Sequence, residues 1–82
     1  MPKASTREAI LSNVVHALRE ERVRQNLSMN KLAERSGLHV SMISLVEREL
    51  RNPTLDALLR ITEALGVDFW KIARAATQQA ES

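Results

Sequence analysis

The stretch LSMNKLAERSGLHVSMISLVERELRNPTLDALLRITEALGV, residues 27–67, decides the fold of this chain. Gly37 separates two short segments, 29–36 and 40–48, in which apolar residues recur at helical spacing. Ser28 is a good N-cap for the first segment, whereas His39 stands at the N-cap position of the second, where Ser, Thr, Asp or Asn is preferred. The stretch therefore predicts two short helices joined by a tight glycine turn.

Helical periodicity continues toward the N-terminus. We expect a long first helix over 6–25, ended by Asn26 in a left-handed conformation. In the second of the two short helices, Ile43, Val46, Glu47 and Leu50 are predicted to share the inward face. The apolar stripe of the first helix is Ile10, Leu11, Val14, Val15 and Leu18.

The residues after the two short helices predict two more. A polar loop at 51–53 leads to a fourth helix, which begins after Thr54 as its N-cap and is stopped by Gly66. Asp68 caps a fifth helix, whose polar end from Gln78 onward is expected to fray. Strand signals are poor throughout, so the chain is predicted to be all-α with five helices. The predicted buried stripe of the fourth helix is Leu55, Leu58, Ile61 and Leu65.

The composition fits one small domain and argues against several protein classes. The chain has 82 residues and a net charge of +2, so we expect one domain over 1–82 with its core at about 7–77 and polar termini. It has no cysteine and only two histidines, so we expect neither a disulfide nor a metal site. No apolar run is long enough for a signal peptide or a membrane span, which favours a cytoplasmic protein.

No group of residues indicates catalysis. The sequence contains no Gly-rich phosphate loop, no Ser/His/Asp set and no pair of carboxylates that periodicity would bring into one pocket. We therefore expect no enzyme activity, no cofactor and no small-molecule ligand. The site-like feature is the helix over 40–48, whose outer face carries small and apolar residues.

Two short helices joined by a tight turn are typical of a helix-turn-helix, in which the second helix enters the major groove of DNA. Small outward side chains, such as Ser41 and Ser44, let the helix backbone approach the base edges closely. Val40 and Leu45 are candidates for contacts with thymine methyl groups, although exposed apolar residues can also face a partner protein. His39 fits either a DNA contact or a plain helix start.

Four motifs in register identify a family resemblance: LAERSGL, ISLVER, RNPTLDALLRI and ALGV. With them the chain, from Leu18 to about Trp70, resembles the Cro/phage-repressor (XRE) helix-turn-helix family. The resemblance implies a compact repressor-like domain in which the second and third helices form the helix-turn-helix. The short length and the ER…RNPT run are similar to restriction–modification controller proteins, which are small dimers that regulate transcription.

The resemblance implies roles for individual residues. Two positions depart from the family pattern: Met29 replaces the usual Gln that braces a phosphate, and Glu49 replaces the favoured Gly. Without that Gly, we expect the third helix to run on toward Leu50. The implied base-reading positions are His39, Val40, Ser41, Ser44 and Leu45; the implied phosphate contacts are Ser28, Met29, Arg48, Arg51 and Asn52; and the implied core ion pair is Arg22 with Glu47.

An apolar group near the C-terminus predicts a dimer interface, since a chain this small has little interior for a tryptophan. The sequence thus favours a homodimeric transcriptional regulator that binds a two-fold symmetric operator in double-stranded DNA, with no membrane association. The alternatives are an antitoxin that regulates its own operon, or an interaction module that has lost DNA binding. The predicted interface residues are Phe69, Trp70, Ile72 and Ala73.

Overall fold

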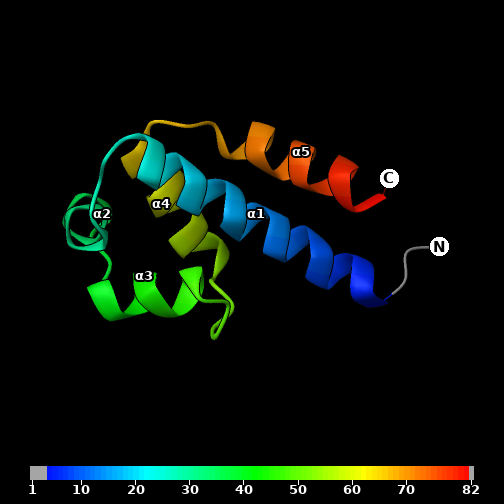
Figure 1. Cartoon of the computed structure of the whole chain (residues 1–82), viewed down its shortest axis with the longest axis horizontal. Helices are drawn as coiled ribbons and strands as arrows, with labels where there is room; N and C mark the ends of the chain where they lie inside the picture. Colours follow the sequence, from blue (N-terminus) through cyan, green and yellow to red (C-terminus); the bar gives the residue numbers. More distant parts are fainter. Residues whose placement is uncertain (1–3, 82) are drawn as a thin grey trace.

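Figure 1 shows a computed structural model of the chain, which describes residues 4–81 and the side chains of residues 6–81. Over residues 4–81 the secondary structure is helical, with five helices and no strand, so the all-α prediction is confirmed. Short connections join the helices, and the longest helix is the first. The helices are α1 (Ala4–Arg24), α2 (Met29–Ser36), α3 (Val40–Glu47), α4 (Leu55–Leu65) and α5 (Phe69–Glu81).

Four helices begin where the sequence predicts a cap. In each case a side-chain acceptor takes a backbone N–H that has no partner within the helix. His39 serves this function through its ring nitrogen, although histidine is not a preferred cap. The four bonds run from Lys31 N–H to Ser28 Oγ (3.0 Å), Ser41 N–H to His39 Nδ1 (3.1 Å), Ala57 N–H to Thr54 Oγ1 (3.0 Å) and Trp70 N–H to Asp68 Oδ1 (3.0 Å).

Left-handed residues follow α1, α2 and α4 as predicted, at Asn26, Gly37 and Gly66. The expectation that α3 runs on toward Leu50 is wrong, because Glu49 itself adopts a left-handed conformation with φ 58°. The N–H groups of Glu49 and Leu50 then bond to Val46 O and Leu45 O, both at 2.9 Å, and satisfy the last carbonyls of α3.

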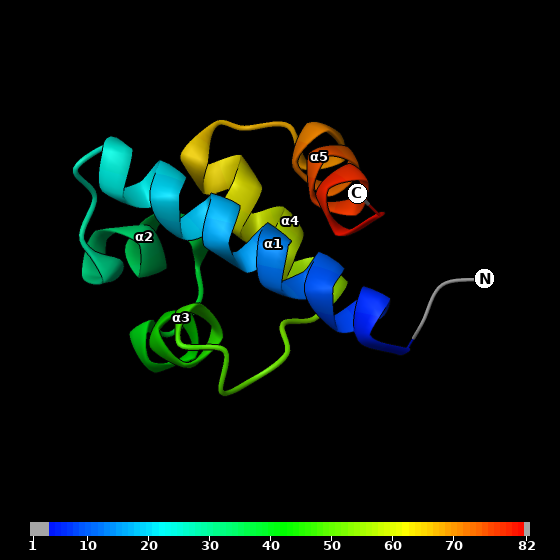
Figure 2. The same ribbon diagram turned by 45° about the vertical axis from the view of Figure 1, so that its right-hand side comes forward.

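The core lies between α1 and the four shorter helices (Figure 2). α1 and α5 lie side by side and antiparallel, and Asn13 Nδ2 donates to Ala76 O at 3.1 Å. The expected fraying from Gln78 is wrong, since α5 stays helical along α1 as far as Glu81. The central buried cluster comprises Val14, Leu18, Leu32, Ala33, Ile43, Leu58, Ile61, Leu65 and Ala76.

Two predicted core leucines lie outside the core. Leu50 is 63% exposed, because the left-handed turn at Glu49 directs the chain away from α3. Leu55 is 61% exposed; it is the first residue of α4, and burial begins only at Ala57. Both leucines therefore remain on the surface.

Among the described residues, no helix is both long and apolar enough to cross a membrane.

Candidate nucleic-acid interface

The turn between α2 and α3 is short and tightly bonded. Gly37 has φ 73°, and its N–H bonds to Ala33 O at 2.9 Å. The buried hydroxyl of Ser36 accepts Leu38 N–H at 3.3 Å, and the Leu38 side chain packs against the core. This geometry fixes α3 relative to α2 and leaves the outer face of α3 on the surface.

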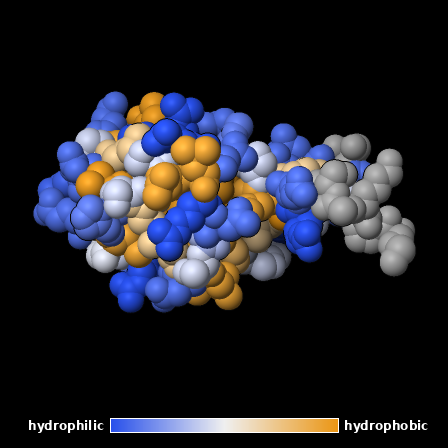
Figure 3. Space-filling model, turned by 90° about the horizontal axis from the view of Figure 1, so that it is seen from below, coloured by the Kyte–Doolittle hydropathy of each residue, from blue (hydrophilic) through white to orange (hydrophobic). Residues whose placement is uncertain are grey.

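Four of the candidate base-reading residues, His39, Ser41, Ser44 and Leu45, lie on that outer face, whereas the fifth, Val40, packs against the core. Ile43 and Val46 point into the core and are 1% and 3% exposed. None of the five candidates is buried: His39 and Ser41 are exposed, and Val40, Ser44 and Leu45 are half-buried. Figure 3 views the molecule from the side on which α3 lies and shows apolar patches among polar side chains. Met42, which the sequence analysis did not single out, is also half-buried on α3.

The candidate phosphate contacts lie at the ends of α2 and α3. Arg48, Arg51 and Asn52 are exposed directly after α3. Ser28 is exposed, with its hydroxyl already engaged as the cap of α2. The Met29 side chain packs against the core, so only its backbone N–H at the start of α2 could meet a phosphate.

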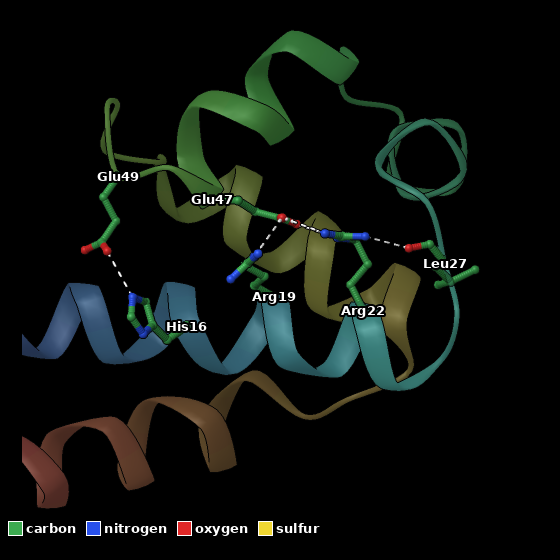
Figure 4. A network of polar contacts seen from close by, with 6 residues as sticks. All are labelled: His16, Arg19, Arg22, Leu27, Glu47 and Glu49. Carbon is green, nitrogen blue, oxygen red and sulfur yellow. Dashed lines mark hydrogen bonds and ion pairs between the residues drawn. The ribbon is translucent and has the colours of Figure 1, made fainter.

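A buried ion pair ties α1 to the end of α3 (Figure 4). Arg22 donates from Nε and Nη2 to the two carboxylate oxygens of Glu47, at 2.7 and 2.9 Å. Its Nη1 donates to Leu27 O at 2.7 Å. The Arg22 and Glu47 side chains are only 10% and 8% exposed. The guanidinium thus holds three elements together: α1, the turn before α2, and α3.

Another contact between α1 and the segment at the end of α3 was not predicted from the sequence. His16 Nε2 donates to Glu49 Oε2 at 3.0 Å, and both side chains are exposed (Figure 4). Hydrogen bonds from Ser12 and then from His16 lower the pKa of Glu49. The one signal in the sequence for this contact was that Glu49 replaces the Gly favoured by the family. That replacement did not indicate which side chain Glu49 would contact.

The four candidate interface residues differ in exposure. Phe69 and Ile72 pack against the core, and Ala73 is half-buried. Trp70 is 59% exposed, with the Arg74 guanidinium 5.3 Å from the centre of its ring. The side chain of Trp70 therefore offers most of the surface that these four residues could give to a partner. Other large apolar residues on the surface are Val23, Leu50, Leu55 and Leu59.

Comparison with known families explains this arrangement. A helix-turn-helix family model matches residues 18–69, more than half of the chain. The chain belongs to the helix-turn-helix family. The matched segment runs from the second half of α1 to the first residue of α5 and includes α2, the glycine turn and α3.

Individual relatives narrow the resemblance. The control protein C.BamHI of Bacillus amyloliquefaciens is 40% identical over 63 residues, covering 70% of this chain and 78% of that protein. An uncharacterized HTH-type transcriptional regulator of Mycobacterium tuberculosis is 46% identical over 50 residues, which cover 61% of this chain but only 36% of that protein. The chain therefore spans about a third of the length of this mycobacterial relative.

A solved structure matches nearly the whole chain. It is a point mutant of C.Esp1396I bound to its highest affinity operator site OM, with a TM-score of 0.78, 26% sequence identity, and coverage of 90% of this chain and 97% of that one. C.Esp1396I is a restriction-modification controller protein. The resemblance to XRE-type regulators and controller proteins, predicted from the sequence, is confirmed.

Proposed function

We propose that this chain is a sequence-specific transcriptional regulator of the restriction–modification controller type, which binds a two-fold symmetric operator in double-stranded DNA as a homodimer. One observation supports this most: α3 presents an unburied face of small and apolar side chains within a segment that matches the helix-turn-helix family. A cytoplasmic location and the absence of enzyme activity belong to the same proposal.

The face of α3 suits close approach to base edges. The major groove, about 12 Å wide, admits one α-helix. Ser44 offers a hydroxyl that donates or accepts, and Leu45 offers methyl groups that match thymine methyls. The Ser41 hydroxyl already bonds to His39 Nδ1 at 2.8 Å and is left as an acceptor, and Val40, which packs against the core, offers only part of its side chain. Arg, Gln and Asn, which make bidentate contacts to bases, do not occur within α3. We therefore expect methyl contacts and DNA shape to contribute much of the sequence preference.

Phosphate contacts would orient α3 in the groove. Arg48, Arg51 and Asn52 follow α3 on the surface and provide two cations and an amide. At the other end of the motif, the backbone N–H groups at the start of α2 beside Ser28 and Met29 suit a phosphate, since a helix N-terminus carries partial positive charge.

A homodimer would place two copies of α3 in successive major grooves, about 34 Å apart on one face of the duplex. The exposed Trp70 is the strongest candidate for a residue that a second copy would cover, together with Phe69, Ile72 and Ala73 around it on α5. Loss of the dimer would halve the contact area on DNA and weaken binding accordingly. Light scattering at micromolar concentration tests this directly, and a monomer would contradict the homodimer.

Selection of binding sites from random duplex DNA, followed by affinity measurements over a range of salt concentrations, tests the DNA-binding function. Arg51→Ala should weaken binding to all sequences and reduce the slope of log K against log salt by about 1. Leu45→Ala should instead alter the selected sequence. Arg24→Ala is the matched control, because it removes one exposed positive charge from the last turn of α1, outside the residues proposed to contact DNA.

An interaction module without DNA binding is the second candidate. It is favoured by the Met29 side chain, which packs into the core where the family uses a polar Gln, and by the apolar residues Val40 and Leu45 on α3. Duplex binding that weakens steeply with salt would exclude this candidate. Absence of binding even at low salt would support it.

A further inference from the structure

Glu49 occupies a backbone conformation that disfavours its own side chain. Among the described residues, Asn26 and Glu49 are the non-glycine residues with positive φ, at 57° and 58°. In this conformation Cβ crowds the following carbonyl oxygen. Asn tolerates it better than most residues because its short amide can bond to nearby backbone, whereas the longer Glu side chain lacks this local compensation. Glu49 therefore needs support from elsewhere in the structure.

That support comes from α1. His16 Nε2 lies 3.0 Å from Glu49 Oε2, across 33 positions of sequence. Hydrogen bonding by Ser12, also on α1, contributes to the same carboxylate and lowers its pKa. The hydrogen bond from His16 is thus the contact with α1 that can hold this carboxylate in place.

Because of its position in the chain, Glu49 affects where the loop after α3 lies. Glu49 lies between Arg48 and Arg51, so its conformation sets the direction in which the chain leaves α3 toward the proposed phosphate contacts. A cleft of about 470 Å³ separates the first turns of α1 from this loop, with Ser12 and Leu11 on one side and Asn52 and Pro53 on the other. The cleft keeps the first turns of α1 from packing closely against the loop. The contact between His16 and Glu49 is therefore important for fixing the position of the loop.

We propose that His16 is a positioning residue for DNA binding: by holding Glu49 in its left-handed conformation, it aligns the loop that carries Arg51 and Asn52 with the phosphate backbone. This inference rests on the proposed function, since it assigns a task within the same DNA-binding site. His16 itself need not touch DNA.

The first test needs no DNA. Leu50 N–H bonds to Leu45 O at 2.9 Å only while Glu49 keeps its left-handed turn. Hydrogen exchange of the Leu50 amide, followed by NMR, should therefore be faster in His16→Ala than in the wild-type chain. Val23→Ala is the matched control, because Val23 is an exposed residue of α1 that has no part in this contact. Unchanged exchange in His16→Ala would overturn the inference.

The second test uses duplex DNA of mixed sequence at low salt. His16→Ala should weaken binding about two- to fivefold, the range that corresponds to one exposed ion pair, while Val23→Ala should bind like the wild type. In the Glu49→Gly background, where the charge at position 49 is the same with and without His16, His16→Ala should no longer weaken binding, since glycine adopts positive φ without support. A general structural defect caused by His16→Ala would weaken binding in this background as well.

Arg51→Ala, measured in parallel, separates the possible failures. If the wild type binds DNA and Arg51→Ala weakens binding while His16→Ala does not, the inference is wrong and the proposed function stands. If His16→Ala weakens binding equally in the Glu49→Gly background, His16 acts other than through Glu49, and the inference is again wrong. Absence of DNA binding by the wild type would overturn the proposed function, and this inference with it.

Discussion

Two of the polar contacts that join α1 to the C-terminal end of α3 differ chiefly in burial (Figure 4). In both, a nitrogen-bearing side chain of α1 meets a glutamate: Arg22 meets Glu47, and His16 meets Glu49. The side chains of the first pair are 10% and 8% exposed, whereas those of the second are 63% and 43% exposed. The two glutamates are two residues apart, yet α3 ends between them.

The difference in burial implies different tasks. If one member of the buried pair is lost, the other charge remains desolvated without a partner, which is costly. If the exposed pair is broken, water solvates both groups again at little cost. The Arg22–Glu47 pair should therefore determine how stable the fold is, and the His16–Glu49 pair should determine only where the loop after α3 lies.

The largest effect is expected for Arg22→Ala. This change leaves Glu47 buried without its bidentate partner and leaves Leu27 O without its donor, so the free energy of unfolding should fall by about 3–5 kcal/mol. Urea denaturation measures this loss. Arg19→Ala is the control, because Arg19 Nε lies 3.9 Å from Glu47 Oε1 and its side chain is 62% exposed. It should cost less than about 1 kcal/mol.

A loss of similar size in the two variants would contradict the comparison. It would mean that the surroundings of Glu47 as a whole stabilise its carboxylate, and that the bidentate bond from Arg22 contributes no more than the contact with Arg19.

The next largest effect tests why Arg22→Ala lowers the free energy of unfolding. If the cost arises from an unpaired buried charge, then replacing both partners by apolar residues should recover most of it. Arg22→Met combined with Glu47→Leu should bring the free energy of unfolding to within about 1 kcal/mol of the wild type. A double variant as unstable as Arg22→Ala would show instead that the hydrogen bonds themselves stabilise the fold.

Features that depend on nearby residues were predicted correctly from the sequence. Each N-cap of α2, α3, α4 and α5 bonds to an atom within a few residues of it. The left-handed ends at Asn26, Gly37 and Gly66 are equally local. Their chemistry is therefore visible in a short window of sequence. The pairing of Arg22 with Glu47 crosses 25 positions, and its prediction depended on the family resemblance.

Features set by tertiary packing were predicted less well. Periodicity places Leu50 and Leu55 on apolar stripes, but it does not show that each stands beyond the edge of the core. The resemblance pointed to Gly at position 49 but not to how a Glu there is accommodated, because the supporting histidine lies 33 positions away. Whether the candidate base and phosphate contacts meet DNA stays a prediction.

A smaller effect tests the strain at Glu49. Glu49→Ala loses the contact with His16 and keeps the crowded Cβ, whereas Glu49→Gly loses both. The Gly variant should therefore be more stable than the Ala variant by about 1–2 kcal/mol, measured by urea denaturation. Equal stabilities would mean that the left-handed conformation at position 49 is not strained, and the contact with α1 would then have nothing to support.

The smallest effect concerns the ionisation of Glu49. Its pKa is lowered by hydrogen bonds from Ser12 and then His16, so the carboxylate should titrate below its usual range in an NMR pH titration of the folded chain. Because the folded-state pKa is the lower one, the stabilisation is present above the ordinary pKa of a glutamate and is lost as the pH falls through the folded value. Ser12→Ala should raise the pKa of Glu49 more than His16→Ala, since Ser12 is the larger cause. If the Glu49 carboxylate titrates normally in the wild type, water and not α1 surrounds it. The contact between His16 and Glu49 would then not position the loop.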